Sequence, residues 1–479
     1  MKTLRKRKIV LVGTLVLIAI GLFKFILIIT ASPKITVDYV AEYNKFARPQ
    51  NYDPNDNAAP YYQKAFDAYV DIPDELPIAQ WKPYTGWPTD FNSSEQVLLE
   101  QWLTSNSQAF EFFKIAVNKP SYWLERQVRD TNLPFDIMLP ELATLRELTR
   151  ALIWDAKVKV IKEQFQPALE NVLDCYKAGS HKCRSNLLLT DQHNGLEIKQ
   201  AAIKSTLIIL DKSKSTIASK VLKSFQDAFM SELAEDNYVP SMQAEKFFLY
   251  DGLQWMFLDN GKGTGRLSWR ICWGYVDTCS DLSSGWQTKW LNLKRRLSCF
   301  IGPTRNETAE QIEQVIAISD QMMTKTPWQV KNESRNYLTE IKNIKNSNLF
   351  LDMGTTNIDP KGTFYLYYNT KVRTEALVAV LAILRFKADT GRFPETLNDL
   401  VSKDYLRAIP QDPYSNSSLI YKISEDNFIL YGVGENFKDD GGKQKTDDIV
   451  FWPPRERPNN IDSNLPIQET NQPSQKLSE

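Results

Sequence analysis

Hydrophobic positions recur at helical spacing along most of the chain. From Glu141 to Lys212 the spacing is nearly continuous, which predicts consecutive helices. Shorter stretches of the same kind lie at Asn57–Phe66 and Glu95–Val117, and further helical patterns fill 215–350. The pattern therefore predicts a mainly helical domain over residues 32–360.

The pattern changes towards the C-terminus. Thr374–Gly391 is an apolar helical stretch that ends in basic residues and a glycine, a usual helix stop. A short second helix, a turn and three strands are predicted after it, at Arg392–Val401, Ile409–Tyr414, Leu419–Ile423, Asn427–Tyr431 and Asp448–Trp452. Residues 361–453 are thus expected to form an α+β module with a small antiparallel sheet.

The N-terminus combines a basic segment at 1–8 with an apolar run at 9–31. The run is long enough to span a bilayer as a helix. Because positively charged flanks stay on the cytoplasmic side, the basic segment 1–8 is expected in the cytoplasm. We therefore expect a single-pass anchor in the inner (cytoplasmic) membrane, with the bulk of the chain in the periplasm or outside the cell. A cleaved signal peptide is the alternative, with Ile29–Ala31 as a weak cleavage site.

Composition supports an ordered outer domain, because 42% of the residues are hydrophobic and 11% aromatic. The formal net charge is +0, and no basic stripe follows the first eight residues. Nucleic acid is therefore not an expected partner. Residues 454–479 are rich in Pro, Asn, Gln and Ser, and are expected to be a disordered tail.

One pair of predicted helices resembles a tetratricopeptide-type hairpin, namely Ala151–Val158 followed by Gln164–Ala178. Small residues at Ala156, Ala168 and Ala178 would let the two helices pack closely. No second copy occurs at that period, so a single hairpin inside a larger helical domain is expected.

The C-terminal module resembles the globular part of the major pseudopilin of type II secretion systems. The matching residues follow in order along the chain: Gly391–Pro394, Leu397, Leu400, Ile409–Pro410, Asp412–Tyr414 and Tyr431–Gly434. The resemblance covers about one sixth of the chain and implies a spine helix, a small antiparallel sheet and a calcium site. In pseudopilins the membrane helix continues directly into the module, follows a prepilin peptidase site and carries an early glutamate. This chain lacks those features, so only the fold of the module is implied.

The resemblance implies calcium (Ca²⁺) at the acidic loop 434–448. The candidate ligands are Asn436, Asp439, Asp440, Asp447 and Asp448. Calcium prefers several carboxylate and carbonyl oxygens from a flexible loop, and glycines at 441 and 442 would let the loop fold tightly. Asp and Gly also favour plain solvated turns, and lysines at 438, 443 and 445 oppose tight binding. Both interpretations stay open at this point.

The five cysteines admit disulfides in an outward-facing chain. Closeness in sequence suggests one disulfide between Cys175 and Cys183 and another between Cys272 and Cys279. Cys299 would then have no partner. Buried free thiols are the alternative.

No nucleophile elbow, phosphate-binding loop or zinc motif occurs, and the chain has only two histidines. The leading hypothesis is therefore a membrane-anchored extracytoplasmic protein that acts by protein–protein contact, associated with secretion or the envelope. The alternative is an extracytoplasmic hydrolase of an envelope polymer that uses a pair of carboxylates.

Overall fold

The computed structural model describes residues 32–454, apart from 80–85, 128–138, 185–186, 214–216, 236–237, 273–292, 294–295, 298, 355–358, 425 and 444–446. The predicted anchor at 9–31 and nearly all of the predicted tail lie outside these residues. In the part that is described, no helix is long and apolar enough to cross a membrane. The predicted fold class is confirmed at the level of a mainly helical chain with small antiparallel sheets near its C-terminus.

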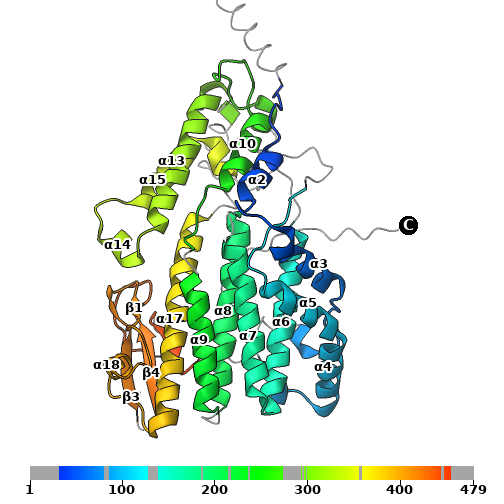
Figure 1. The fold of residues 1–479 in the computed structure, drawn as a ribbon. Helices are drawn as coiled ribbons and strands as arrows, with labels where there is room; N and C mark the ends of the chain where they lie inside the picture. Colours follow the sequence, from blue (N-terminus) through cyan, green and yellow to red (C-terminus); the bar gives the residue numbers. More distant parts are fainter. Residues whose placement is uncertain are drawn as a thin grey trace, which may run out of the picture.

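The body of the molecule is a row of long helices packed side by side (Figure 1). They are α6 (Pro140–Ile161), α7 (Phe165–Arg184), α8 (Leu189–Lys212), α9 (Ser219–Glu235) and α17 (Pro360–Thr390). Helices α6 and α7 form the predicted hairpin. The small residues expected at its interface are all fully buried, namely Ala156, Ala168 and Ala178.

Helices α7 and α8 touch through two glycines. A Cβ atom on Gly179 would lie 2.6 Å from the carbonyl oxygen of Gly195, and one on Gly195 would lie 2.7 Å from that of Gly179. The backbones are therefore in direct contact at this crossing. As a consequence Lys182, one turn after Gly179, comes to face Asp191, one turn before Gly195.

Helix α17 joins the helical body to the C-terminal module. It ends at Gly391, which has a φ of 78°, as the sequence predicts. It begins at Pro360 instead of Thr374, and its 31 residues span about 46 Å. Every residue from Ala376 to Ile383 is buried, in a core shared by the helical body and the sheet.

Three further helices, α3 (Ala59–Asp67), α4 (Ser93–Ser105) and α5 (Ser107–Val117), pack beside α6 and α7. Glu95–Val117 is not one helix as predicted, because it breaks at Asn106. The buried Asn106 side chain accepts a hydrogen bond from the Val70 N–H (3.0 Å) and donates one to the Val70 carbonyl (3.0 Å). Short 3₁₀ turns connect this region, at Pro54–Asp56, Pro77–Ala79 and Pro88–Asp90.

A second group of helices forms the upper part of the molecule in Figure 1 and has its own apolar core. That core comes mainly from α10 (Glu245–Met256), α13 (Arg305–Met323), α15 (Tyr337–Ser347) and α16 (Leu349–Gly354), and α2 (Tyr39–Ala47) packs on α10. The short α14 (Pro327–Asn332) reaches from this group to the C-terminal module, where the Trp328 N–H donates to the Pro413 carbonyl (3.0 Å).

The module contains α18 (Leu397–Ser402), the hairpin β1 (Gln411–Asp412) and β2 (Ser417–Ser418), and the sheet strands β3 (Ile420–Ser424), β4 (Asn427–Gly432) and β5 (Ile449–Trp452). The sheet is antiparallel in the order β3-β4-β5, with Tyr421 opposite Leu430 and Tyr431 opposite Val450. The three predicted strands are confirmed to within one residue. The second helix starts at Leu397 and not Arg392, because the Asp399 carboxylate accepts the Thr396 N–H (2.8 Å) and caps the helix there.

The disulfide suggested between Cys175 and Cys183 is wrong. Both residues lie on α7, and eight residues along a helix rise about 12 Å, far beyond the reach of a disulfide. Their thiols donate instead to the Thr149 and Gln192 carbonyls, each at 3.7 Å.

Candidate functional sites: the acidic loop and a buried charge cluster

The acidic loop folds tightly through its glycines, as the sequence predicts. Gly441 and Gly442 have φ values of 86° and 69°, in the left-handed region that favours glycine. A Cβ atom on Gly442 would also lie 2.8 Å from the ring of Tyr431. The loop therefore packs directly on β4.

Asp448 is the centre of the loop. It is buried at the start of β5, and its carboxylate accepts N–H hydrogen bonds from Asp440 (3.1 and 3.2 Å) and Gly442 (2.7 Å). The Asp440 carboxylate in turn accepts from the Asn436 side-chain amide (2.8 Å). Asn436, Asp440 and Asp448 are thus linked in one chain of hydrogen bonds.

The other two candidate ligands are not part of this chain of hydrogen bonds. The Asp439 carboxylate accepts from the Tyr431 hydroxyl (3.0 Å) and the Gly441 N–H (2.8 Å). Asp447 is exposed to solvent. The loop therefore brings three of the five candidates together and leaves two apart.

Asp412 is an acidic residue of this region that the metal prediction omitted. It is buried, and its carboxylate accepts from the backbone N–H groups of Tyr414 (3.0 Å) and Val433 (2.8 Å). Burial raises the pKa of Asp412, these hydrogen bonds oppose the rise, and the nearby Asp448 charge adds to it. In the sequence, the Asp412–Tyr414 motif was the signal that could have pointed to this residue. The Asp412 carboxylate ties the β1–β2 hairpin to the end of β4.

The oxygen-rich donor set suits calcium by its chemistry. Within the described residues, however, no three acidic, histidine or cysteine side chains surround a common point. Hydrogen bonds within the loop hold it closed. An ion would therefore compete for the Asp448 carboxylate with the backbone N–H groups of Asp440 and Gly442. Calcium at this loop stays a prediction.

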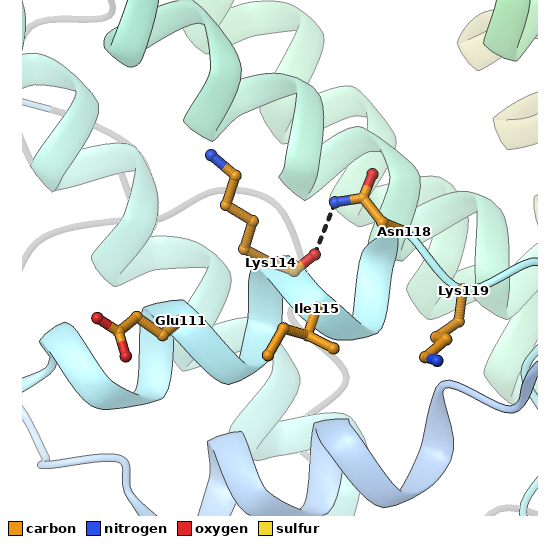
Figure 2. Close-up of a pocket in the computed structure, with 5 residues that line it drawn as sticks. All are labelled: Glu111, Lys114, Ile115, Asn118 and Lys119. Carbon is orange, nitrogen blue, oxygen red and sulfur yellow. Dashed lines mark hydrogen bonds between the residues drawn. The ribbon is translucent and has the colours of Figure 1, made fainter. Parts of the chain in front are cut away.

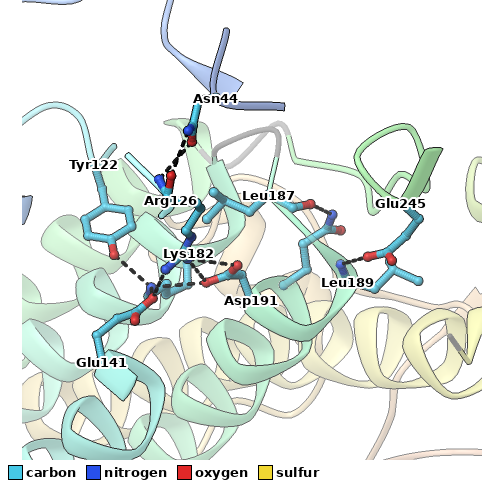
Figure 3. Close-up of polar contacts among 10 residues, drawn as sticks. Asn44, Tyr122, Arg126, Glu141, Lys182, Leu187, Leu189, Asp191 and Glu245 are labelled. Atoms are coloured by element: carbon cyan, nitrogen blue, oxygen red, sulfur yellow. Dashed lines mark hydrogen bonds and ion pairs between the residues drawn. The ribbon is translucent and has the colours of Figure 1, made fainter. Parts of the chain in front are cut away.

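A second set of charged side chains, which the sequence did not reveal, is buried where α6, α7 and α8 meet (Figure 3). We call Arg126, Glu141, Lys182 and Asp191 the charge cluster; none is more than 6% exposed. Arg126 hydrogen-bonds Glu141 and donates to both Asp191 oxygens (2.9 and 3.1 Å). Lys182 donates to Asp191 (3.2 Å) and Glu141 (3.4 Å).

The cluster holds two cations and two carboxylates, so its formal charges balance. Burial by itself would lower the pKa of Lys182, yet Tyr122, Asp191 and Glu141 together hold that pKa above its ordinary value. At Arg126 burial likewise acts to lower the pKa. The nearby charges of Asp191 and Glu141 outweigh burial and raise the pKa of Arg126 above its ordinary value. Both cations therefore stay charged inside the protein.

Neighbouring elements hold the cluster in place. Tyr122 accepts a hydrogen bond from Lys182 (2.9 Å), and its segment continues to Arg126. The Asn44 side chain on α2 makes two hydrogen bonds to the Arg126 backbone, each of 2.8 Å (Figure 3). The cluster thus fastens α2 and the segment after α5 to the long helices.

Glu245 on α10 lies next to the cluster and caps α8 from another helix. Its carboxylate accepts the Leu189 N–H (2.7 Å), where α8 has no capping side chain of its own. Burial raises the pKa of Glu245 to about 7 against the effect of that hydrogen bond, and Asp191 adds to the rise. Glu245 therefore connects the upper helices to the body.

The carboxylate pair of the cluster does not have the geometry expected of a hydrolase. A hollow of about 460 Å³ opens beside Arg126, with Asn44, Arg48 and Trp123 among its lining residues. Glu141 and Asp191 do not line it, and each faces two cations. A substrate in the hollow would meet neither carboxylate, so we assign the cluster a structural role.

A second hollow, of about 620 Å³, lies along α5 (Figure 2). Its lining residues come from one face and the end of that helix, namely Glu111, Lys114, Ile115, Asn118 and Lys119. Ile115 is 44% exposed, and the Asn118 side chain is already bonded to the Lys114 carbonyl (2.7 Å). The hollow is a shallow surface feature, with no buried polar group among the lining residues to orient a ligand.

Comparisons with protein-family models, with curated proteins and with solved structures give no match. The resemblance of the C-terminal module to pseudopilins therefore rests on the residues quoted above.

Proposed function

We propose that the protein is a membrane-anchored, extracytoplasmic protein that acts by protein–protein contact in the cell envelope. Its C-terminal module would have a pseudopilin-like fold and be stabilised by calcium. Residues 9–31 would form the anchor, and the secretion-associated role is the one that the resemblance implies.

The burial of α17 limits which surface of the module could contact another protein. The residues from Ala376 to Ile383 that would otherwise be free to contact another subunit are covered by α8, α9 and the sheet. The module is therefore built into a large helical body, which argues against assembly into a filament through this helix. Contacts with other proteins would use its outer surface.

The edge of the sheet at β3 is the surface we propose for such a contact. Among the described strands β3 pairs only with β4, so the backbone groups on its other side can pair with an extended segment of a partner. Lys422, Ile423 and Ser424 are exposed there, and Ile423 is 48% exposed. A partner strand at this edge would cover an exposed apolar side chain and remove its surface from water, which favours the contact.

Photo-crosslinking in the native cell tests this proposal. A photoreactive residue at Ile423 is expected to give an adduct of one defined mass. The matched control is Ile161 at the end of α6, which is 47% exposed and should give no such adduct. Equal adducts at the two positions, or none at Ile423, would contradict a contact at β3.

A further inference from the structure

Near its start, the described part of the chain is hydrogen-bonded to the end of α10. The Thr36 and Val37 N–H groups both donate to the Gln254 side-chain oxygen (3.0 and 3.2 Å), and the Gln254 amide donates back to the Val37 carbonyl (2.7 Å). Ala31, the last residue of the predicted anchor, is five positions before Thr36. Five residues extend over about 18 Å at most. If residues 9–31 lie in a bilayer, Gln254 is therefore within about 18 Å of the end of the anchor.

Backbone hydrogen bonds connect this end of α10 to the start of α13. The Leu258 N–H donates to the Arg266 carbonyl (2.9 Å), and the Arg305 N–H donates to the Gly265 carbonyl (2.8 Å). Ile301 lies four residues before Arg305, and it lines a hollow of about 590 Å³ together with Arg266. The segment just before α13 therefore lies at the same end of the upper helices as the attachment of the chain that follows the anchor.

Apolar side chains are exposed along one face of this segment. Leu293, Leu297 and Ile301 are helical, and they are 47%, 41% and 72% exposed. A spacing of four residues places them on one face of a helix, which we call the outer face. Cys299 lies on the opposite side, is 1% exposed and packs into the core of the upper helices. One side of the segment is thus turned into the core, and an apolar side is turned outwards.

The chain that carries the outer face is rich in cations. Residues 282–306 contain five lysines and arginines and no acidic residue, an excess that the charge balance of the whole chain conceals. The exposed Lys262 precedes Gly263, whose carbonyl accepts a hydrogen bond at the start of α13 (3.0 Å). Acidic residues resume at Glu307, whose carboxylate already accepts the Thr304 N–H (2.7 Å). Positive charge is therefore concentrated around the exposed apolar side chains.

Tryptophan is concentrated in the same part of the sequence. Five of the twelve tryptophans lie between residues 255 and 290. Tryptophan, lysine and arginine favour the boundary between lipid chains and water. The composition and the exposed face therefore indicate the same partner, the surface of a bilayer.

We propose that the outer face rests on the membrane that holds the anchor, with Leu293, Leu297 and Ile301 against lipid chains and the neighbouring cations at anionic headgroups. An apolar face flanked by cations is typical of a helix that lies in the interface of a bilayer. The inference rests on the proposed function, because the anchor is what brings this face to the membrane.

This contact would orient the whole molecule. Helix α13 begins beside the outer face and has 19 residues, a length of about 28 Å. Beyond its far end lies α14, which contacts the C-terminal module through the Trp328 N–H. The module and the edge of β3 would therefore be held away from the membrane, where a partner protein could reach them.

Photo-crosslinking of the full-length protein in lipid nanodiscs tests the contact. The discs contain phosphatidylcholine and anionic phosphatidylglycerol, and a diazirine-bearing residue replaces either Ile301 or Leu293. We expect lipid adducts at both positions. The matched control is Ile161, which is 47% exposed like Leu293 but lies at the opposite end of α6 from Glu141 and the charge cluster. We expect no lipid adduct there.

A substitution within the outer face provides a second readout. Leu297→Glu is expected to lower the yield of lipid adducts at Ile301 about tenfold, because it replaces an apolar contact with lipid by a charge. Adducts of Ile301 with protein in place of lipid, equal lipid adducts at Ile161, or a yield that Leu297→Glu leaves unchanged would overturn the proposal.

The recovery of the protein with the discs tests the anchor separately. A protein that enters the discs but gives no lipid adduct at Ile301 contradicts the surface contact alone. A protein that stays out of the discs contradicts the anchor, and the surface contact falls with it.

Discussion

Replacing Asp191 by asparagine is expected to lower the free energy of unfolding by about 3–5 kcal/mol. Asp191 is fully buried and accepts hydrogen bonds from both Arg126 and Lys182. Asparagine keeps the shape of the side chain but removes its charge, which leaves two buried cations facing the single carboxylate of Glu141. The loss would be measured as a shift in the urea unfolding midpoint of the purified full-length protein.

A matched substitution provides the control. Asp227 forms an exposed pair with Lys223 (2.6 Å), and Asp227→Asn should cost less than about 0.5 kcal/mol. Adding Lys182→Met to Asp191→Asn should recover part of the lost stability, because charge balance returns at similar volume. Equal effects of Asp191→Asn and Asp227→Asn would show that the charge cluster does not stabilise the fold.

Calcium is expected to raise the unfolding free energy of the full-length protein by about 2.7 kcal/mol at one hundred times its dissociation constant. The full chain is the right material, because the module cut out at Thr374 would expose the face of α17 that α8 and α9 cover. The measurement compares melting temperatures in calcium and in chelator. Magnesium should substitute poorly, since it demands a stricter octahedral geometry.

Two variants separate binding from folding. Asp448→Ala removes three hydrogen-bond contacts to backbone N–H groups and should destabilise the loop even without calcium. Asp440→Asn keeps an oxygen that can accept from the Asn436 amide but removes one of the joined carboxylates, so in chelator it should melt like the parent and only its response to calcium should fall. Identical melting of the parent in calcium and in chelator would mean that the loop is a plain turn.

Local signals predicted the C-terminal module well. Helix α17 ends where one residue, Gly391, tolerates a positive φ. The strands were predicted from apolar and polar residues that alternate between turn residues. Such features act over a few positions, so a single sequence contains them. The break at Asn106 depends instead on Val70, 36 residues away, and no local pattern contains that contact.

The charge cluster was beyond prediction for the same reason. Arg126 and Asp191 are 65 residues apart, and charged residues usually lie in solvent, so no local pattern marks these as buried. The sequence signal nearest to the cluster is Gly179 and Gly195, which lie one turn from Lys182 and Asp191. Two glycines allow the backbones of two helices to come into contact, as they do here. The sequence placed all five predicted calcium ligands in one loop, but it could not show that Asp439 bonds Tyr431 or that Asp447 is exposed to solvent.

The account depends most on the side of the membrane where the helical body and its module lie. A reporter fused after Pro453, active only outside the cytoplasm, measures this directly. We predict an active reporter that stays with the membrane fraction after a high-salt wash, because the basic segment 1–8 and the apolar run 9–31 predict an uncleaved anchor with its basic end inside. Recovery of the fusion in the soluble cytoplasm, with an inactive reporter, would contradict the account.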